Sequence, residues 1–301
     1  MTERLGDIEA RIATVHQIEE VVGAMRGIAA MRTREAREQL DGIRSYAETI
    51  AGAIGQALAF LPPDGHLESA REAPAGHAII ALCAEQGFAG AFSDRILDAV
   101  DGLAGKYPQQ NTELLLIGDR GLMVAGEREL AVDWSAPMVA HPAQAAALAS
   151  RIAEALYERL DGGQVTHVTL LHTTPDLAAG FEVMGKQLIP FDFARFPLPA
   201  TAVAPLTTLA PQVLLVKLAE EYVFAEICEA VMLSFAAENE ARMRAMIAAR
   251  ANVADKRDSL VARARQLRQE EITNEIIELA GGSGAQRRAG RGKHLKRRAE
   301  T

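Results

Sequence analysis

The stretch from Gln212 to Ala280 contains neither glycine nor proline. As one helix, about 69 residues would measure on the order of 100 Å, since each residue adds roughly 1.5 Å. Helices of globular proteins average only about 11–12 residues. We therefore expect this helix to project from any compact domain of the chain, and the function to depend more on what the helix contacts than on a pocket.

The first 61 residues precede the first proline, Pro62, and also predict a single helix. One heptad column is entirely apolar, and it consists of Ile8, Val15, Val22, Ala29, Ala36 and Ile43. The second core column is interrupted by Glu19, Arg26 and Thr33, as expected where a long helix is wrapped imperfectly by its partner. Gly23 and Gly27 share one face and each costs about 1 kcal/mol relative to alanine. We expect another backbone to approach closely there.

Residues 74–200 alternate short apolar runs with amphipathic segments. Strands are predicted at 78–83, 114–118 and 165–172, helices at 93–107 and 143–160, and a hairpin at 182–191. Strands that alternate with helices indicate a small, mainly parallel, Rossmann-like sheet.

Each terminal helix has an apolar stripe that it cannot bury alone. We therefore predict an α/β protein in which the N-terminal helix (1–61) and the C-terminal helix (211–281) form an antiparallel coiled coil. The α/β domain is inserted at one end of this shaft, and a basic, disordered tail follows at 286–301. The side chains expected to pack in the coiled coil are Ile8, Val15, Val22, Met25, Met243, Met246, Ile272 and Ile276.

Charge is unevenly distributed around a formal net charge of −8. Residues 212–240 contain one lysine and six glutamates, residues 242–268 contain eight basic and two acidic residues, and residues 287–298 contain seven basic residues and no acid. A basic band either is a solvated helix surface or faces an acidic partner. Nucleic acid is disfavoured as that partner, because the band lacks interleaved aromatic residues and the chain as a whole is acidic.

The two cysteines, Cys83 and Cys228, lie far apart in apolar contexts, which indicates a reducing compartment and no disulfide framework. The first residues lack the apolar run of a signal peptide, and no window approaches about 18 apolar residues. With the excess of arginine over lysine, these features favour the cytoplasmic face of a bacterial membrane.

Both terminal helices contain long, specific strings. The N-terminal string is Val15-His-Gln-Ile-Glu-Glu-Val-Val-Gly-Ala-Met-Arg-Gly-Ile-Ala-Ala-Met-Arg. The C-terminal strings are Ser234-Phe-Ala-Ala-Glu-Asn-Glu-Ala-Arg-Met-Arg-Ala-Met and Arg268-Gln-Glu-Glu-Ile-Thr-Asn-Glu-Ile-Ile-Glu. These strings resemble the gamma subunits of F-type ATP synthases. More loosely, Glu85-Gln-Gly-Phe-Ala-Gly is similar to the family's Asp-Arg-Gly-Leu-Cys-Gly segment. The resemblance covers residues 1–285.

This resemblance implies a rotating central stalk. Its helices would fill the hole of a ring of alternating alpha and beta subunits, and its α/β domain would sit with the epsilon subunit on a membrane ring of c subunits. Ion flow would turn the stalk, which would drive each beta subunit in sequence through its nucleotide states. No bond would be made or broken on this chain, so the resemblance implies no catalytic residue, cofactor or metal.

The resemblance also assigns a set of contacts with the beta subunit, namely Met25, Arg26, Arg242, Arg268, Gln269, Thr273 and Glu275. Met25 and Arg26 stand where the family has Met-Lys near the acidic lever loops of beta, with arginine offering a planar, forked donor instead of lysine. Arg268, Gln269 and Thr273 stand where the family hydrogen-bonds the catch loop of beta. The alternative for Gln269 and Thr273 is that exposed polar residues of a helix have no partner.

The chain departs from the family in several places. Ile18, Val22 and Gly23 replace residues that are commonly polar in the first helix, and Glu85-Gln86 replaces an Asp-Arg pair. The basic tail extends beyond the family's usual end, either as a solvated extension or as an element at the top of the rotor. These departures indicate a divergent branch.

Two other classes of function fit less well. A nucleotide-dependent enzyme would need a Gly-x-Gly-x-x-Gly or Walker motif, and neither occurs. His167 and His172 lie five apart on a predicted strand, so they point to opposite faces, which disfavours a shared metal. A free-standing coiled-coil scaffold would need the second heptad column to be apolar.

Overall fold

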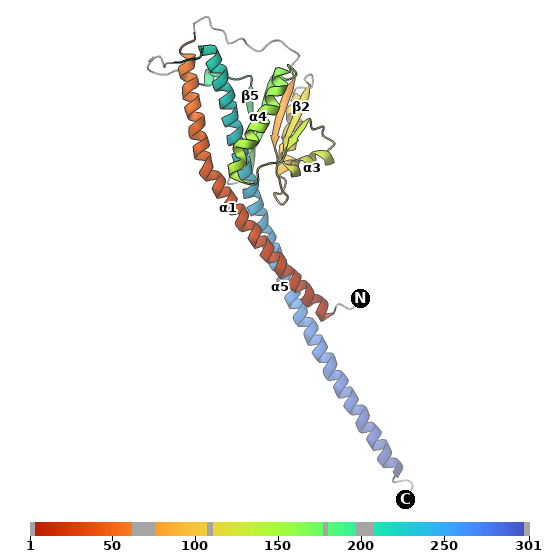
Figure 1. The fold of residues 1–301 in the computed structure, drawn as a ribbon. Helices are drawn as coiled ribbons and strands as arrows, with labels where there is room; N and C mark the ends of the chain where they lie inside the picture. The colour runs from red at the N-terminus through yellow and green to blue at the C-terminus, as the bar shows by residue number, and fades with distance from the viewer. Residues whose placement is uncertain (1–3, 62–75, 107–110, 177–179, 197–206, 298–301) are drawn as a thin grey trace. The chain divides into compact units, whose positions relative to one another are not determined.

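The computed structural model describes residues 4–61, 76–106, 111–176, 180–196 and 207–297 (Figure 1). For residue 278 and residues 280–297 it describes the backbone alone. The chain divides into two compact units. One is Met25–Met246, and the other combines Met1–Ala24 with Ile247–Thr301.

Two long helices begin and end the described chain. Helix α1 is Leu5–Leu58 and helix α5 is Pro211–Arg297. Pro211 occupies the first helical position of α5, where its missing N–H removes no intrahelical bond. The predicted end of this helix at 281 and the predicted disordered tail differ from the structure, in which the helical backbone continues to Arg297. No proline follows Pro211, and glycine weakens a helix by about 1 kcal/mol without removing a backbone donor.

Five strands form one sheet in the order β3-β2-β1-β4-β5. They are β1 His77–Leu82, β2 Thr112–Ile117, β3 Trp134–Ala136, β4 His167–Asp176 and β5 Gly180–Ile189. Strands β1 to β4 run parallel, and β5 pairs antiparallel with β4, with His172 opposite Met184. The prediction of a mainly parallel sheet is confirmed, as is a hairpin strand near residues 182–191.

The connecting helices are α2 Phe92–Lys106, α3 Asp119–Glu127 and α4 Ala145–Asp161, with single 3-10 turns at Pro142–Gln144 and Phe193–Arg195. The sequence predicted α2 and α4 but missed α3 and β3, because both are too short to show a clear period. Helix α3 also contains Gly121, which reads as a helix breaker. The glycine is required there, since a Cβ would lie 2.1 Å from the Cβ of Cys83.

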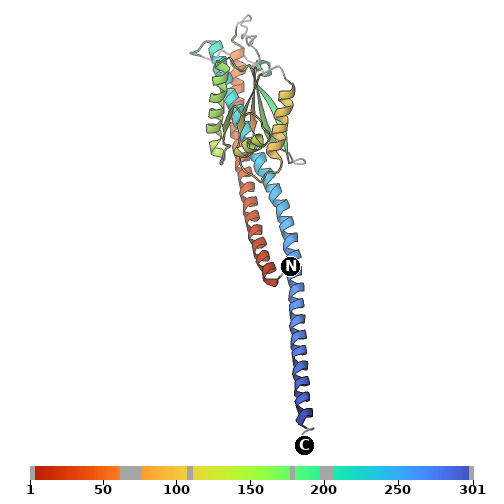
Figure 2. The same cartoon turned by 90° about the vertical axis from the view of Figure 1, so that its right-hand side faces the viewer.

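The sheet of the Met25–Met246 unit is covered on both faces (Figure 2). Along β1 the side chains alternate. Ile79 and Ala81 belong to a core with α2 and α3, whereas Ala78, Ile80 and Leu82 belong to a core with α4, α5 and part of α1. All six residues of β1 are buried. A strand buried on both faces explains why this segment is an unbroken apolar run in the sequence.

Cys83 and Cys228 lie in these two cores and are both unpaired thiols. Burial raises the pKa of each thiol to about 12. A thiol with such a pKa remains protonated near neutral pH and is a poor nucleophile.

The other unit has a small apolar core between α1 and α5. Ile8, Leu260 and Leu267 are buried there, and Leu5, Ile12, Val15 and Ala264 pack against them. Two ion pairs flank this core. Arg268 Nη2 lies 2.7 Å from a carboxylate oxygen of Glu9, and Arg257 Nη1 lies 3.0 Å from one of Glu19. Because residue numbers rise in one helix as they fall in the other, the two segments run antiparallel.

Candidate interaction surfaces on the long helices

The glutamates in the first part of α5 form ion pairs and hydrogen bonds within the Met25–Met246 unit. Glu240 pairs with Arg37 at 2.9 Å, and Glu229 pairs with Arg44 at 2.8 Å. Glu221 accepts a hydrogen bond from Tyr46, and this bond raises the pKa of the tyrosine to about 12.

Glu226 is buried among cations of the same unit. It accepts from Arg195 at 2.6 Å and also pairs with Lys186. With the two ion pairs above, much of the negative charge in this part of α5 is compensated within the chain, so the acidic segment is structural.

The basic part of α5 is compensated less completely. Arg257 and Arg268 pair with α1, but Arg250, Lys256 and Arg265 are exposed and have no partner among the described residues. Arg26 of α1 is likewise exposed and unpaired within the described chain. These side chains remain available to an acidic partner.

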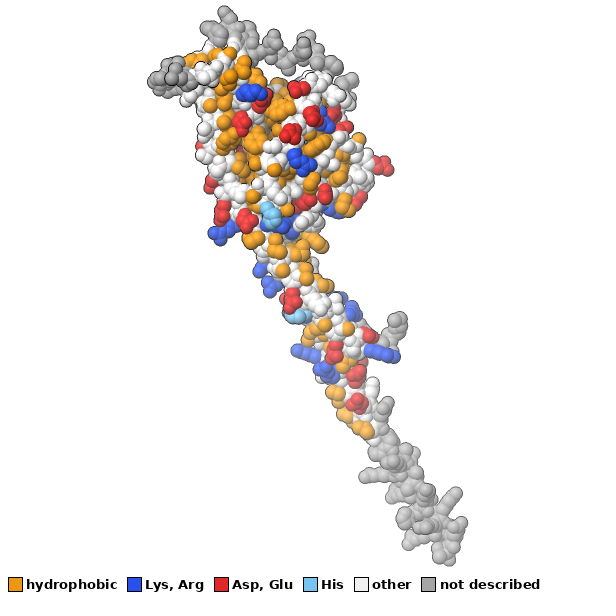
Figure 3. Space-filling model, in the orientation of Figure 1, with side chains coloured by type: hydrophobic (Ala, Val, Ile, Leu, Met, Phe, Trp, Pro, Cys, Tyr) orange, Lys and Arg blue, Asp and Glu red, His pale blue; other side chains and the backbone are white. Residues whose placement is uncertain are grey.

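Beyond Leu267, helix α5 is exposed around its whole circumference, since every residue from 268 to 277 is exposed. Ile272, Ile276 and Ile277 are 50%, 61% and 62% exposed. Figure 3 shows hydrophobic side chains on the surface of the long helices. The prediction that Ile272 and Ile276 pack in a coiled coil is therefore wrong for this chain alone. Described α1 begins at Leu5, which packs in the cluster that ends with Leu267, so no described segment of α1 covers the following turns.

The remaining predicted packing residues lie deeper. Ile8, Val22 and Met246 are buried, whereas Val15, Met25 and Met243 are half-buried. The predicted polar contacts Gln269, Thr273 and Glu275 are exposed. The Thr273 hydroxyl donates to the Gln269 carbonyl at 2.7 Å, an ordinary bond within a helix that leaves the Gln269 side chain available.

Arg242 was expected at the surface, and the structure corrects this expectation. Its side chain is only 5% exposed. Its Nε donates to the Gly87 carbonyl at 3.2 Å, its Nη2 donates to the Gln86 carbonyl at 3.2 Å, and it is ion-paired with Glu238. A guanidinium used in this way inside the chain is not a partner contact.

The expected close approach of a backbone at Gly23 and Gly27 is also absent from the described structure. A Cβ at either position would have no described atom within 4 Å. In this chain alone the two glycines therefore only weaken α1.

Replacing both Gly23 and Gly27 by alanine should raise the stability of the isolated chain, with about 1 kcal/mol expected from each site. Thermal unfolding followed by circular dichroism measures this effect. An unchanged or lower unfolding temperature would mean that another backbone does approach these glycines in solution.

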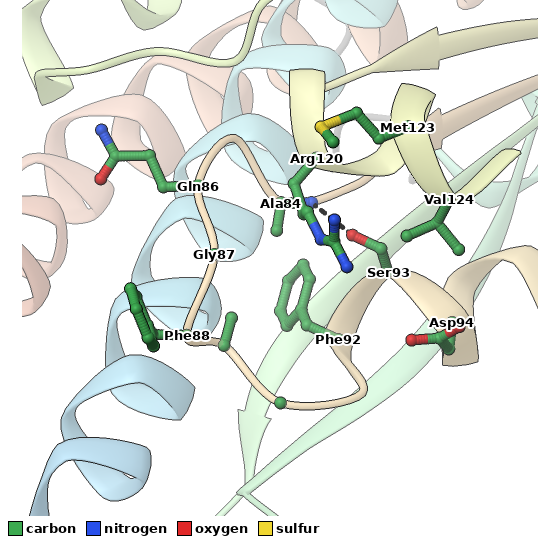
Figure 4. Close-up of a pocket in the computed structure, with 12 residues that line it drawn as sticks. Ala84, Gln86, Gly87, Phe88, Phe92, Ser93, Asp94, Arg120, Met123 and Val124 are labelled. Carbon is green, nitrogen blue, oxygen red and sulfur yellow. Dashed lines mark hydrogen bonds between the residues drawn. The ribbon is translucent and has the colours of Figure 1, made fainter. Parts of the chain in front are cut away.

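The carboxyl end of β1 borders a cavity of about 540 Å³, which is where ligands bind in doubly wound sheets. It is lined by the loop after β1, the start of α2 and part of α3 (Figure 4). The N–H groups of Glu85 and Gln86 in this loop donate to the Glu238 carboxylate of α5. These two donors are therefore not available to a ligand phosphate.

Glu238 was not singled out from the sequence, although a signal was present. It lies four residues before Arg242, the spacing at which a helical glutamate and arginine pair. The residues that the sequence could not supply were its backbone partners in the loop, more than 150 positions away in the chain.

Neither metal ligands nor a membrane span emerge from the described residues. Within that part of the chain, no group of three or more His, Cys, Asp or Glu residues could hold a metal ion. No described helix is long and apolar enough to cross a membrane. His167 is half-buried and His172 is buried, both on β4.

These features define a class of α/β proteins in which two long terminal helices flank an inserted, doubly wound sheet. The profile of a family described as ATP synthase matches residues 4–285. The chain belongs to this ATP synthase family.

Relatives of the chain include ATP synthase gamma chains. It is 24% identical over 282 residues to the ATP synthase gamma chain of Flavobacterium psychrophilum, covering 93% of this chain and 98% of the relative. It is 27% identical over 286 residues to that of Solibacter usitatus, with the same coverage.

Solved structures agree in fold. A chain of the Euglena gracilis mitochondrial ATP synthase OSCP/F1/c-ring structure superposes with a TM-score of 0.60 at 12% identity, covering 93% of this chain and 94% of that one. A chain of the Tetrahymena thermophila central stalk/c-ring structure gives 0.54 at 20% identity, covering 76% and 99%.

Proposed function

We propose that this chain is the central-stalk (gamma) subunit of an F-type ATP synthase. It couples ion flow through a c ring to the conformational cycle of the beta subunits, in the direction of ATP synthesis or hydrolysis. The family match and the names of the relatives support this role. In this proposal α1 and α5 form an antiparallel coiled coil, and the chain has no catalytic site and no cofactor of its own.

The proposal rests on the exposed segment of α5 that follows Leu267. Helix residues 268–277 are all exposed and include three isoleucines. An isolated helix is marginally stable in water, and an apolar surface of this kind indicates a binding site. A surrounding ring of alpha and beta subunits would cover the helix on every side.

Charge supplies the second argument. The cations Arg26, Arg250, Lys256 and Arg265, which have no partner among the described residues, would complement acidic loops of the beta subunits. Because the two helices present different faces to the three beta subunits, the stalk binds their conformations with different energies, and rotation shifts this bias from one subunit to the next.

The same proposal places the chain at the membrane without a span of its own. The α/β domain would sit with the epsilon subunit on the c ring, at the cytoplasmic face of a bacterial membrane. The chain is therefore peripheral, and its membrane association depends on the complex.

Coexpression with the alpha and beta subunits of the same organism tests the proposal. We expect a complex with one copy of this chain per ring and higher ATPase activity than the ring alone, measured by size exclusion and a coupled ATPase assay. A chain that elutes alone, with the activity of the ring unaffected, would point to a scaffold instead.

Replacing Arg268 and Gln269 by alanine should weaken the coupling of stalk and ring. The lost hydrogen bonds are expected to lower the affinity for the ring about tenfold, or about 1.4 kcal/mol. The chain contains a matched control, since Arg265 and Gln266 repeat the same pair one turn earlier. Replacing them by alanine removes the same net charge but none of the proposed catch-loop hydrogen bonds, so only the electrostatic attraction of Arg265 is lost and the effect should be smaller. Binding of each variant to the ring and rotation of the assembled complex measure the two effects. Equal effects of the two double variants would mean that net charge alone matters.

A further inference from the structure

The loop after β1 is fastened to α5 by a buried carboxylate. The N–H groups of Glu85 and Gln86 each donate to Glu238 at 3.3 Å. Glu238 is 2% exposed, so little water competes for these bonds. The helix thus places an anion of its own at the edge of the sheet where doubly wound proteins bind ligand anions.

Arg242, one turn further along α5, holds the carbonyl groups of the same loop. It donates to Gln86 and Gly87 and is paired with Glu238. Its remaining nitrogen donates to Asn239 Oδ1 at 3.1 Å. Two side chains of one helix therefore satisfy both donors and acceptors of a single loop, and Figure 4 shows this loop beside the helix.

Neighbouring residues of α5 make similar bonds to β4, the strand next to β1 in the sheet. Ser234 Oγ accepts from the backbone N–H of Thr173 at 3.1 Å, and Arg244 Nη2 donates to the carbonyl of Asp176 at 3.1 Å. Both partners lie on β4. Residues 234–244 are thus bonded to segments that follow β1 and to the end of β4.

Hydrogen bonds and apolar contacts differ in how well they resist rotation of α5 against the sheet. Elsewhere α5 meets the sheet mainly through apolar side chains such as Val223 and Ile227, and the Glu226–Lys186 pair with β5 adds an ionic contact. Apolar contacts are non-directional, so they oppose separation more strongly than sliding. Hydrogen bonds depend on angle as well as distance, so rotation or sliding of α5 by a fraction of a turn would break them.

We propose that Glu238 and Arg242 are positioning residues that transmit torque between α5 and the α/β sheet. The inference rests on the proposed function, because torque is meaningful only for a rotating stalk. A buried ion pair is weak evidence of stabilisation, since an apolar pair of similar volume often does as well. If the contact between α5 and the loop after β1 must resist twisting, it requires directional hydrogen bonds, which an apolar pair would not provide.

The test uses the complete complex in membrane vesicles and measures ATP-driven ion pumping per ATP hydrolysed. Glu238→Gln keeps the shape of the side chain but removes its charge, and Arg242→Lys removes the forked donor. We expect each variant to lower the pumping ratio roughly threefold or more, because breaking a buried pair is strongly disruptive. ATP hydrolysis by the assembled complex should be retained, and Glu238→Asp should restore part of the pumping.

A matched control removes an ion pair of the same domain that does not involve α5. Asp98 of α2 is exposed and pairs with Arg128 at 2.7 Å. Asp98→Asn should leave the pumping ratio at the wild-type value. Thermal unfolding of every variant separates loss of folding from loss of coupling.

If the Glu238 variants do not fold, Ser234→Ala replaces them, because it removes one bond to β4 without leaving a buried charge unpaired. A wild-type pumping ratio in every variant that folds would overturn the proposal that Glu238 and Arg242 transmit torque. The proposal would also be overturned if the pumping ratio fell only in proportion to the amount of assembled complex. A wild-type chain that fails to assemble with its ring would instead contradict the proposed function.

Discussion

Replacing Ile272 and Ile276 by aspartate should abolish stable assembly with the alpha–beta ring while leaving the isolated chain as stable as the wild type. Both side chains are at least half exposed in the structure, so the free chain loses no packing. If the ring encloses this turn of α5, each aspartate becomes a buried, unpaired charge in the complex. Hot-spot residues of interfaces contribute about 2 kcal/mol or more each, so the pair should lower affinity by well over a hundredfold.

Size exclusion of the coexpressed subunits measures assembly, and circular dichroism measures the unfolding temperature of the free chain. Val213 is the matched control, since it is a β-branched residue of the same helix with the same exposed fraction, 50%. Val213→Asp should leave ring assembly intact, because this residue lies near the start of α5, far along the helix from residue 272. Normal assembly of the Ile272→Asp, Ile276→Asp double variant would show that the ring does not enclose this turn.

Replacing Gly118 by alanine should destabilise the Met25–Met246 unit by about 3 kcal/mol or more, since a strained backbone and an overpacked site each cost about 1–3 kcal/mol. Gly118 connects β2 to α3 with a φ of +106°, a conformation that side chains disfavour. An added Cβ would also lie 2.6 Å from the carbonyl oxygens of both Cys83 and Ala84. These are backbone atoms at the end of a central strand, so they cannot move aside without shifting β1.

Urea unfolding monitored by circular dichroism measures this loss. Gly126→Ala is the matched control from the neighbouring helix α3, where a Cβ would meet no described atom within 4 Å. This control should be neutral or slightly stabilising, because alanine is the better helix former. If Gly118→Ala and Gly126→Ala were equally stable, the carbonyl groups of Cys83 and Ala84 would be able to move at little cost to β1.

The long helices, most of the strands and the family could be predicted from the amino-acid sequence. The absence of glycine and proline from Gln212 to Ala280 is a local property, so it predicts a helix without reference to tertiary contacts. The apolar run of β1 similarly predicts a strand buried on both faces. The family motifs identified both helices because these strings are long and specific.

Which face of each helix packs against the rest of the chain depends on the tertiary fold. The spacing of apolar residues does not distinguish Arg242 from Arg268. In the structure, Arg242 is buried against the loop after β1, whereas Arg268 is exposed. Ile8 and Ile276 both follow the apolar spacing, but the first is fully buried and the second is bare. Periodicity describes neighbours three or four positions away, whereas burial here depends on segments more than 150 positions apart, and on where α1 begins relative to α5.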